Sequence, residues 1–190
     1  MFEELVRKAR STRRFDTADP LAFSDLRAWV NVARLAPSAS NQQPIRYRIV
    51  HGAECAKLFP ATKWAGALKK WNGPTDAQQP TGYIALASDA DAPAPGVDLG
   101  IAAMTLQLAA ADTGWAACML GAFDPNVVNP LLAIPQPWTV RLLVAFGRAA
   151  EKIELVEGLA PDGPRYWRDE NGTHFVPKRL LSDVLLPAPE

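Results

Sequence analysis

The segment from Asp98 to Thr113 constrains the fold of this 190-residue chain more than any other part. It is rich in alanine, and Thr105 and Gln107 are its only polar side chains between residues 99 and 111. This run predicts a helix that is apolar on nearly every face and ends at Gly114, and such a helix must be buried on all sides. Because a chain of this length builds one modest core, we expect part of the helix to be buried at a subunit interface.

Strand patterns recur on both sides of this helix. Ile45, Tyr47 and Ile49 occupy alternate positions, which predicts a strand over residues 45–51. Apolar runs predict further strands over residues 81–88, 115–120 and 140–146, the last of them closed by Gly147-Arg148.

Helical patterns alternate with these strands. Helices are predicted over residues 2–9, over 24–35 with Ser24 as the N-cap and Pro37 as the stop, in one or two stretches within 54–70, and over 125–132. The residues from about 150 onward are expected to be rich in loops. The alternation favours one α+β domain that spans residues 1–190.

Charge and cysteine content exclude several classes of protein. Lysine plus arginine equals aspartate plus glutamate at 20 each, which argues against a nucleic-acid-binding or polybasic membrane-binding protein. No segment reaches the roughly 18 apolar residues that span a bilayer, and residues 1–14 lack the apolar stretch of a secretory signal. The two cysteines and two histidines form no metal motif or disulfide framework, so we expect a cytoplasmic protein without a metal.

Four segments, taken together and in order, resemble the nitroreductase family of FMN-dependent oxidoreductases. They are Arg-Ser-Thr-Arg-Arg-Phe at 10–15, Ala-Pro-Ser-Ala-Ser-Asn-Gln-Gln-Pro at 36–44, Asp-Leu-Gly at 98–100 leading into the alanine-rich helix, and the apolar strand that ends in Phe-Gly-Arg at 146–148. The resemblance implies a homodimer with two FMN sites at its interface, each built from both subunits. It also implies a three-layer α+β sandwich with a mostly antiparallel central sheet flanked by helices.

The first motif supplies Arg10, Ser11 and Arg13. In an extended chain, Arg10 and Arg13 are separated by about 10 Å, enough to reach different regions of one cofactor. By resemblance these residues contact the phosphate, the ribityl chain and the pyrimidine edge of FMN, with Arg13 near N1 and the C2 carbonyl. A cation there favours the anionic reduced flavin. For the tetrapeptide alone, a solvated basic turn after a helix remains the alternative.

The second motif supplies Pro37, Ser38, Asn41 and Gln43. Small polar side chains and free backbone amides in a loop can bind ribityl and phosphate oxygens without crowding them. By resemblance this loop reaches the flavin of the other subunit. Taken alone, it also suits an ordinary turn between a helix and a strand. Ile45 stands where family members often carry an aromatic residue, so we expect the local packing to differ.

Two further segments resemble cofactor contacts of the family. Leu120 and Gly121 match a turn whose backbone passes the flavin ring near N5, and a plain turn from a strand to a helix is the alternative. Lys178 and Arg179 match a basic pair that holds the FMN phosphate. Arg148 is a second candidate for the phosphate, and surface charge is the alternative for each.

The resemblance predicts ping-pong hydride transfer. NAD(P)H, bound transiently, would reduce FMN at N5, and a quinone, nitroaromatic or similar electron-poor small molecule would reoxidise it. No side-chain acid or base is required, so no catalytic residue is predicted. Trp64 and Trp71 form either a lid over the flavin or plain packing. Three alternatives remain open: a flavin-storage or flavin-sensing protein without turnover, a specialised family member acting on another substrate, and a dimeric interaction protein without flavin.

Overall fold

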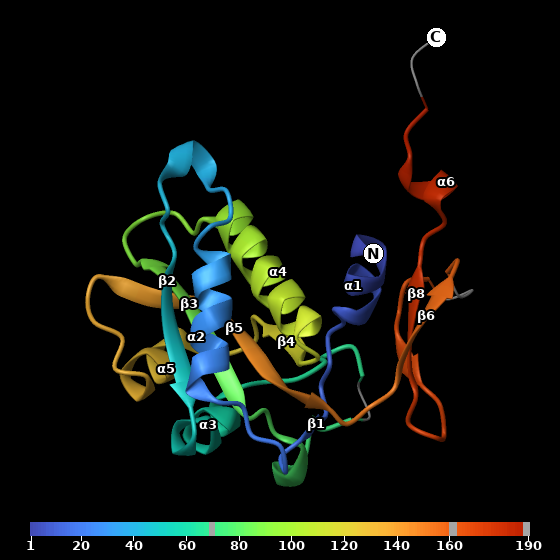
Figure 1. The fold of residues 1–190 in the computed structure, drawn as a ribbon, viewed down its shortest axis with the longest axis horizontal. Coiled ribbons are helices and arrows are strands. Elements are labelled where there is room, and N and C mark those ends of the chain that lie inside the picture. The colour runs from blue at the N-terminus through green and yellow to red at the C-terminus, as the bar shows by residue number, and fades with distance from the viewer. Residues whose placement is uncertain (69–70, 160–162, 188–190) are drawn as a thin grey trace.

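A five-stranded sheet forms the centre of the molecule (Figure 1). The computed structural model describes residues 1–68, 71–159 and 163–187. The strands are β1 (Phe15–Asp16), β2 (Arg46–His51), β3 (Gly82–Asp89), β4 (Ala116–Leu120) and β5 (Trp138–Ala149). β5 pairs with β1, β3 and β4, and β2 pairs with β3. Every one of these pairings is antiparallel, as expected for the central sheet.

Helices cover both faces of the sheet. On one face, α2 (Phe23–Ala33) and α4 (Gly96–Asp112) pack in a buried cluster with Ile84 and Leu86 of β3. On the other face, α3 (Ala53–Leu58) and α5 (Pro125–Leu131) pack in a second cluster with Tyr83 and Ala85. Consecutive β3 residues point to opposite faces, so this fully apolar strand contributes to both clusters. The structure is therefore the expected three-layer α+β sandwich.

The alanine-rich helix α4 is buried on one side only within a single chain. Ala102, Ala103, Leu106, Gln107 and Ala110 of α4 are buried against the core. The other side carries residues that keep partial exposure, namely Leu99, Ile101, Met104, Thr105 and Leu108. These residues form an apolar stripe along α4 that the rest of the chain covers only in part. Its burial at a subunit interface remains a prediction.

Two expectations about local structure were wrong. The helix α2 begins at Phe23 with Ala22 as its cap residue, so Ser24 lies inside the first turn and makes no cap. Gly147 and Arg148 do not close β5, which continues to Ala149 because β1 pairs with its end. Non-local pairing with β1, and not the residues of the strand, decides where β5 ends.

The segment after residue 150 holds more regular structure than expected. β6 (Ile153–Glu157), β7 (Trp167–Arg168) and β8 (His174–Lys178) form a second sheet in the order β6-β8-β7, followed by α6 (Leu181–Val184). β6 and β8 are parallel. In Figure 1 this small sheet stands beside α1 (Phe2–Lys8), and α6 extends beyond it. We name residues 151–178 the C-terminal sheet segment.

The predicted helical region over residues 54–70 is shorter than expected. It contains α3 and the 3₁₀ turn η2 (Phe59–Ala61), and Lys69 and Lys70 lie outside the described residues. Two further 3₁₀ turns are η1 (Ala39–Asn41) and η3 (Asp76–Gln78). Among the helices that the structure describes, none has the length and apolar character needed to cross a bilayer.

Candidate cofactor-binding site

A cavity of about 330 Å³ lies between α4, the end of α1 and the C-terminal sheet segment. Its lining includes Arg10, Ser11, Arg13 and Lys178, which the sequence places in two segments more than 160 residues apart. Met104 and Gln107 of α4 line it as well. A cavity of this size suits a small organic ligand. Four of the predicted site residues therefore meet in one place within a single chain.

Strand-like pairing holds the first motif in an extended form beside the sheet. Ser11 forms a parallel bridge with Ala117 of β4, and the backbone N–H of Thr12 donates to the carbonyl of Ala117 at 2.9 Å. The backbone N–H of Arg13 donates to the carboxylate of Glu151 at 2.5 Å. These contacts fix the backbone of the motif on both sides, so its side chains project from a rigid support.

The cavity is lined by three basic side chains, those of Arg10, Arg13 and Lys178. Within residues 1–68, 71–159 and 163–187, no carboxylate forms an ion pair with Arg10, Arg13 or Lys178. The Nη2 of Arg10 donates to the carbonyl of Val6 at 2.7 Å, but its buried Nε has no partner among the described residues. Burial lowers the pKa of Arg10 from its usual value. Arg10 and Arg13 are partly buried and Lys178 is exposed. Guanidinium and ammonium groups without an ion-pair partner favour an anion such as a phosphate.

Arg179 lies next to this cavity. It lines an adjoining groove of about 430 Å³ that also includes Arg10 and Lys178. Both hollows are lined by Arg10 and Lys178, and Glu3 and Glu157 also line the groove. Lys178 and Arg179 therefore lie at the boundary between the two hollows, close to Arg10. The structure thus brings the C-terminal basic pair to the first motif.

Leu120 and Gly121 lie near the cavity but do not line it. Met119, the residue before them in β4, is one of its lining residues. Leu120 is buried, whereas Gly121 is exposed, and a Cβ placed on Gly121 would meet no atom within 4 Å. Open space over a glycine backbone permits the close approach of a flat ligand.

The second motif lies elsewhere in the chain. Pro37, Ser38 and Gln43 line a separate cavity of about 110 Å³, and Asn41 lines neither cavity. The loop contacts α4 through Asp98, whose carboxylate accepts the N–H of Ala39 at 3.0 Å. Asp98 is roughly 9–14 Å along the helix axis from Met104 and Gln107, so one chain does not join the two motifs.

The backbone of this loop is strained. Ser40, Asn41 and Gln43 have φ angles of 48°, 54° and 48°, in the left-handed region that residues other than glycine seldom adopt. The hydroxyl of Ser38 accepts the N–H of Gln43 at 2.7 Å and helps to hold this conformation. Strained backbone of this kind is concentrated at binding and catalytic sites.

Arg148 is engaged away from the cavity. Its Nε pairs with Asp19 at 2.6 Å, its Nη1 donates to the carbonyl of Gly114 at 2.8 Å, and its guanidinium lies 3.7 Å from the ring centroid of Trp115. These contacts use the donors that a phosphate would need. The geometry favours Lys178 over Arg148 as an anion ligand.

The two tryptophans considered for a lid differ in their surroundings. Trp64 packs edge-on against Phe15 and donates from its indole to Thr62 at 3.0 Å, which is core packing. The ring centroid of Trp71 lies 5.7 Å from the guanidinium carbon of Arg14 and 4.2 Å from that of Arg168.

Sequence reasoning missed three residues around the cavity. Glu151, with its side chain only 1% exposed, accepts from Arg13 and pairs with Arg168 at 2.5 Å. Tyr166 and His174 line the cavity. Burial and the nearby cations lower the pKa of His174 to about 4, so this histidine is neutral near pH 7. No local pattern marks these residues, because the C-terminal sheet segment contacts the first motif only after folding.

Fold and site together define a class: an α+β sandwich with a long apolar helix and a cavity lined by three basic side chains. The sequence profile of the Nitroreductase family matches residues 6–148. The chain therefore belongs to the nitroreductase family. No match was found among curated proteins.

Solved structures share the fold at low sequence identity. A nitroreductase family protein from Streptococcus pneumoniae TIGR4 is 24% identical with a TM-score of 0.69, over 85% of this chain and 97% of that one. A putative nitroreductase in complex with FMN from Exiguobacterium sibiricum 255-15 is 20% identical with a TM-score of 0.64, over 79% and 89%. A putative NAD(P)H:FMN oxidoreductase from Staphylococcus epidermidis ATCC 12228 is 16% identical with a TM-score of 0.65, over 79% and 87%.

Proposed function

We propose that the chain is an FMN-dependent oxidoreductase that uses NAD(P)H as a transient reductant for a small electron-poor acceptor. The observation that carries the proposal is the cavity in which Arg10, Ser11, Arg13 and Lys178 meet, with none of the three cations in an ion pair among the described residues. Membership of the nitroreductase family supports a flavin oxidoreductase in general. The similarity to a structure described as a complex with FMN supports that choice of cofactor.

The residues present fit the phosphate end of FMN. Arg10, Lys178 and Arg179 offer guanidinium and ammonium donors to a dianion, and the unpartnered Nε of Arg10 is a donor that a bound oxygen would satisfy. Ser11 adds a hydroxyl for the phosphate or the ribityl chain. Charge-assisted hydrogen bonds from several donors orient the cofactor as well as bind it.

Arg13 serves the other end of the cofactor in this proposal. FMN, when bound, carries hydride between NAD(P)H and the acceptor, so the protein supplies position and charge. A guanidinium at the pyrimidine edge stabilises negative charge there and favours the reduced form. The open backbone at Gly121 leaves room for the ring, and the buried Leu120 anchors that turn in the core.

We propose further that the working form is a homodimer. The loop with Pro37, Ser38, Asn41 and Gln43 does not reach the cavity of its own chain, and α4 keeps a half-exposed apolar stripe. A second copy packed on that stripe would bury it and bring the strained loop to the cavity of its partner. The loop would then contact the ribityl chain through small polar groups.

A stopped-flow measurement tests the activity. Purified protein supplied with FMN is mixed with NADH or NADPH under nitrogen, and the flavin band is followed before and after addition of menadione or a nitroaromatic compound. Rapid bleaching by one nucleotide, followed by return of colour with the acceptor, is the expected result. Flavin that binds but is bleached by neither nucleotide would contradict turnover and favour a storage or sensing protein.

A further inference from the structure

The C-terminal sheet segment reaches Arg13 in two ways. It lies beyond residue 148, where the match to the family profile ends. Glu151 accepts the backbone N–H of Arg13, and the ring of Tyr166 lies 4.9 Å from the guanidinium carbon of Arg13. The first contact fixes the backbone of Arg13 and the second fixes the end of its side chain.

Tyr166 itself is held in place by His174. The two rings stack with centroids 5.0 Å apart and an interplanar angle of 30°. His174 belongs to β8 and is completely buried, so it cannot move without disturbing that strand. Tyr166 keeps partial exposure and lines the cavity together with Arg13. The tyrosine ring is thus a fixed surface beside a flexible cationic side chain.

The side chain of Arg13 makes one further hydrogen bond, and it is to a neighbouring backbone carbonyl. Its Nη1 donates to the carbonyl of Ser11, two residues earlier, at 3.1 Å. A guanidinium above an aromatic face is attracted by the ring quadrupole, and this attraction leaves its in-plane donors free for a ligand. An arginine that is already ordered also loses less conformational freedom when the ligand arrives.

We propose that Tyr166 is a positioning residue for the flavin site: its ring holds the guanidinium of Arg13 toward the cavity, where it meets the pyrimidine edge of FMN. The inference rests on the proposed function. It adds to that function a specificity element contributed by a segment outside the family match. The ring, and not the hydroxyl, carries the effect.

Substitution of Tyr166 separates the ring from the hydroxyl. Tyr166→Leu removes the π face, and we expect the Kd for FMN to rise between about twofold and about thirtyfold, the range for one cation–π contact. Tyr166→Phe keeps the face and is expected to stay within about twofold of the wild type. FMN Kd is measured on apoprotein by quenching of flavin fluorescence, with a thermal melt of each variant to confirm folding.

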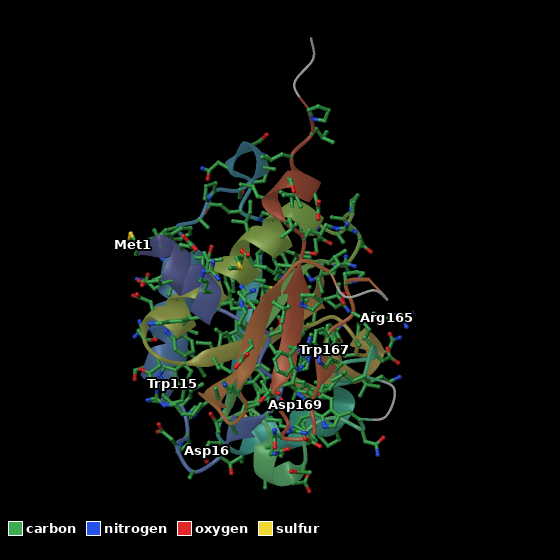
Figure 2. The ribbon with its side chains drawn as sticks, turned by 90° about the vertical axis from the view of Figure 1, so that its right-hand side faces the viewer. Met1, Asp16, Trp115, Arg165, Trp167 and Asp169 are labelled. Carbon is green, nitrogen blue, oxygen red and sulfur yellow. The ribbon has the colours of Figure 1, made fainter. Side chains whose placement is uncertain are left out.

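Sulfite provides a readout that a general loss of structure does not explain. Sulfite adds to oxidised flavin, and a cation at the pyrimidine edge stabilises the negative charge that the addition creates. We expect the sulfite Kd of FMN-loaded Tyr166→Leu to rise over the same range, and that of Tyr166→Phe to stay unchanged. Trp167→Leu is the matched control, because the ring centroids of Trp167 and Phe175 lie 5.4 Å apart and Trp167 does not line the cavity. Figure 2 labels Trp167 on the small C-terminal sheet.

A double-variant comparison shows whether Tyr166 acts through Arg13. In an Arg13→Met background, Tyr166→Leu is expected to change the FMN Kd by less than about twofold, because the group it positions is absent. A Tyr166→Leu variant that binds FMN and sulfite as tightly as Tyr166→Phe would overturn the inference and leave the proposed function standing. A full effect of Tyr166→Leu in the Arg13→Met background would also overturn it. Wild-type protein that binds no FMN would instead refute the proposed function itself.

Discussion

The ion pair between Glu151 and Arg168 gives a stability prediction with a definite size. The two side chains are 1% and 11% exposed, and Nη2 of Arg168 lies 2.5 Å from the carboxylate. Nε and Nη1 of Arg168 have no other partner among the described residues. Glu151→Leu therefore leaves a buried guanidinium unpaired, which costs about 3–5 kcal/mol.

For a chain of this length each kcal/mol lowers Tm by about 2–4 °C, so the expected fall is roughly 6–20 °C in a calorimetric or circular-dichroism melt. Glu151→Leu combined with Arg168→Met removes both charges and is expected to recover most of the loss. Glu3→Gln is the control, since Glu3 pairs with Arg7 at 2.8 Å on the surface, and the exposed pair is worth about 0.3–0.5 kcal/mol. A Tm of Glu151→Leu within about 2 °C of that of Glu3→Gln would refute the claim that loss of Glu151 leaves a buried charge unpaired.

Three further outcomes are expected. Asp98→Ala removes the acceptor for the N–H of Ala39 and should raise the Kd for FMN in the dimer about tenfold. Asp98→Asn keeps an acceptor oxygen, so its Kd should stay near that of the wild type, and equal Kd values for the two variants would contradict this role. Burial raises the pKa of Cys55 to about 12 and that of Cys118 to about 11, so neither thiol should react with an aromatic disulfide reagent at pH 8 until the protein is unfolded. Burial lowers the pKa of His174 to about 4, so its stabilising contribution is full above about pH 6.5 and is lost as the pH falls toward 4. The Tm of the wild type should therefore fall more than that of His174→Phe over this interval, and equal falls in Tm for the two proteins would contradict this prediction.

The central layers of the fold could be predicted from the sequence because their signals are local. The apolar run of β3 and the alanine-rich run of α4 stand out without knowledge of what they contact. Strand and helix boundaries were less predictable. β5 extends past Gly147 only because Phe15, more than 130 residues earlier, pairs with Ala149. Such non-local pairing leaves no mark in the residues of the strand itself.

Part of the candidate site could likewise be predicted from local motifs, and part of it could not. Motif positions such as Arg10, Arg13 and Lys178 could be proposed from residue type and order, and the structure brings them to one cavity. Glu151 and Tyr166 could not, because a lone acidic residue and a lone tyrosine in a loop-like stretch have no distinctive spacing. Glu151 reaches the first motif because β1 pairs with the end of β5, and the backbone N–H of Ala150 donates to the carbonyl of Arg14. Tyr166 contacts Arg13 from the C-terminal sheet segment. The predicted meeting of that motif with the 36–44 loop needs two chains and stays a prediction.

The most direct test of the account is a titration of the apoprotein with FMN. The cavity predicts saturation at one FMN per chain. The Kd for FMN is expected to rise by about tenfold or more in Lys178→Met, because the substitution removes an ammonium group from the phosphate end. The Kd is expected to change little in Arg148→Met, because Arg148 pairs with Asp19 away from the cavity. Wild-type protein that leaves the FMN fluorescence unchanged up to saturating concentrations, or an equal loss of affinity in both variants, would contradict it.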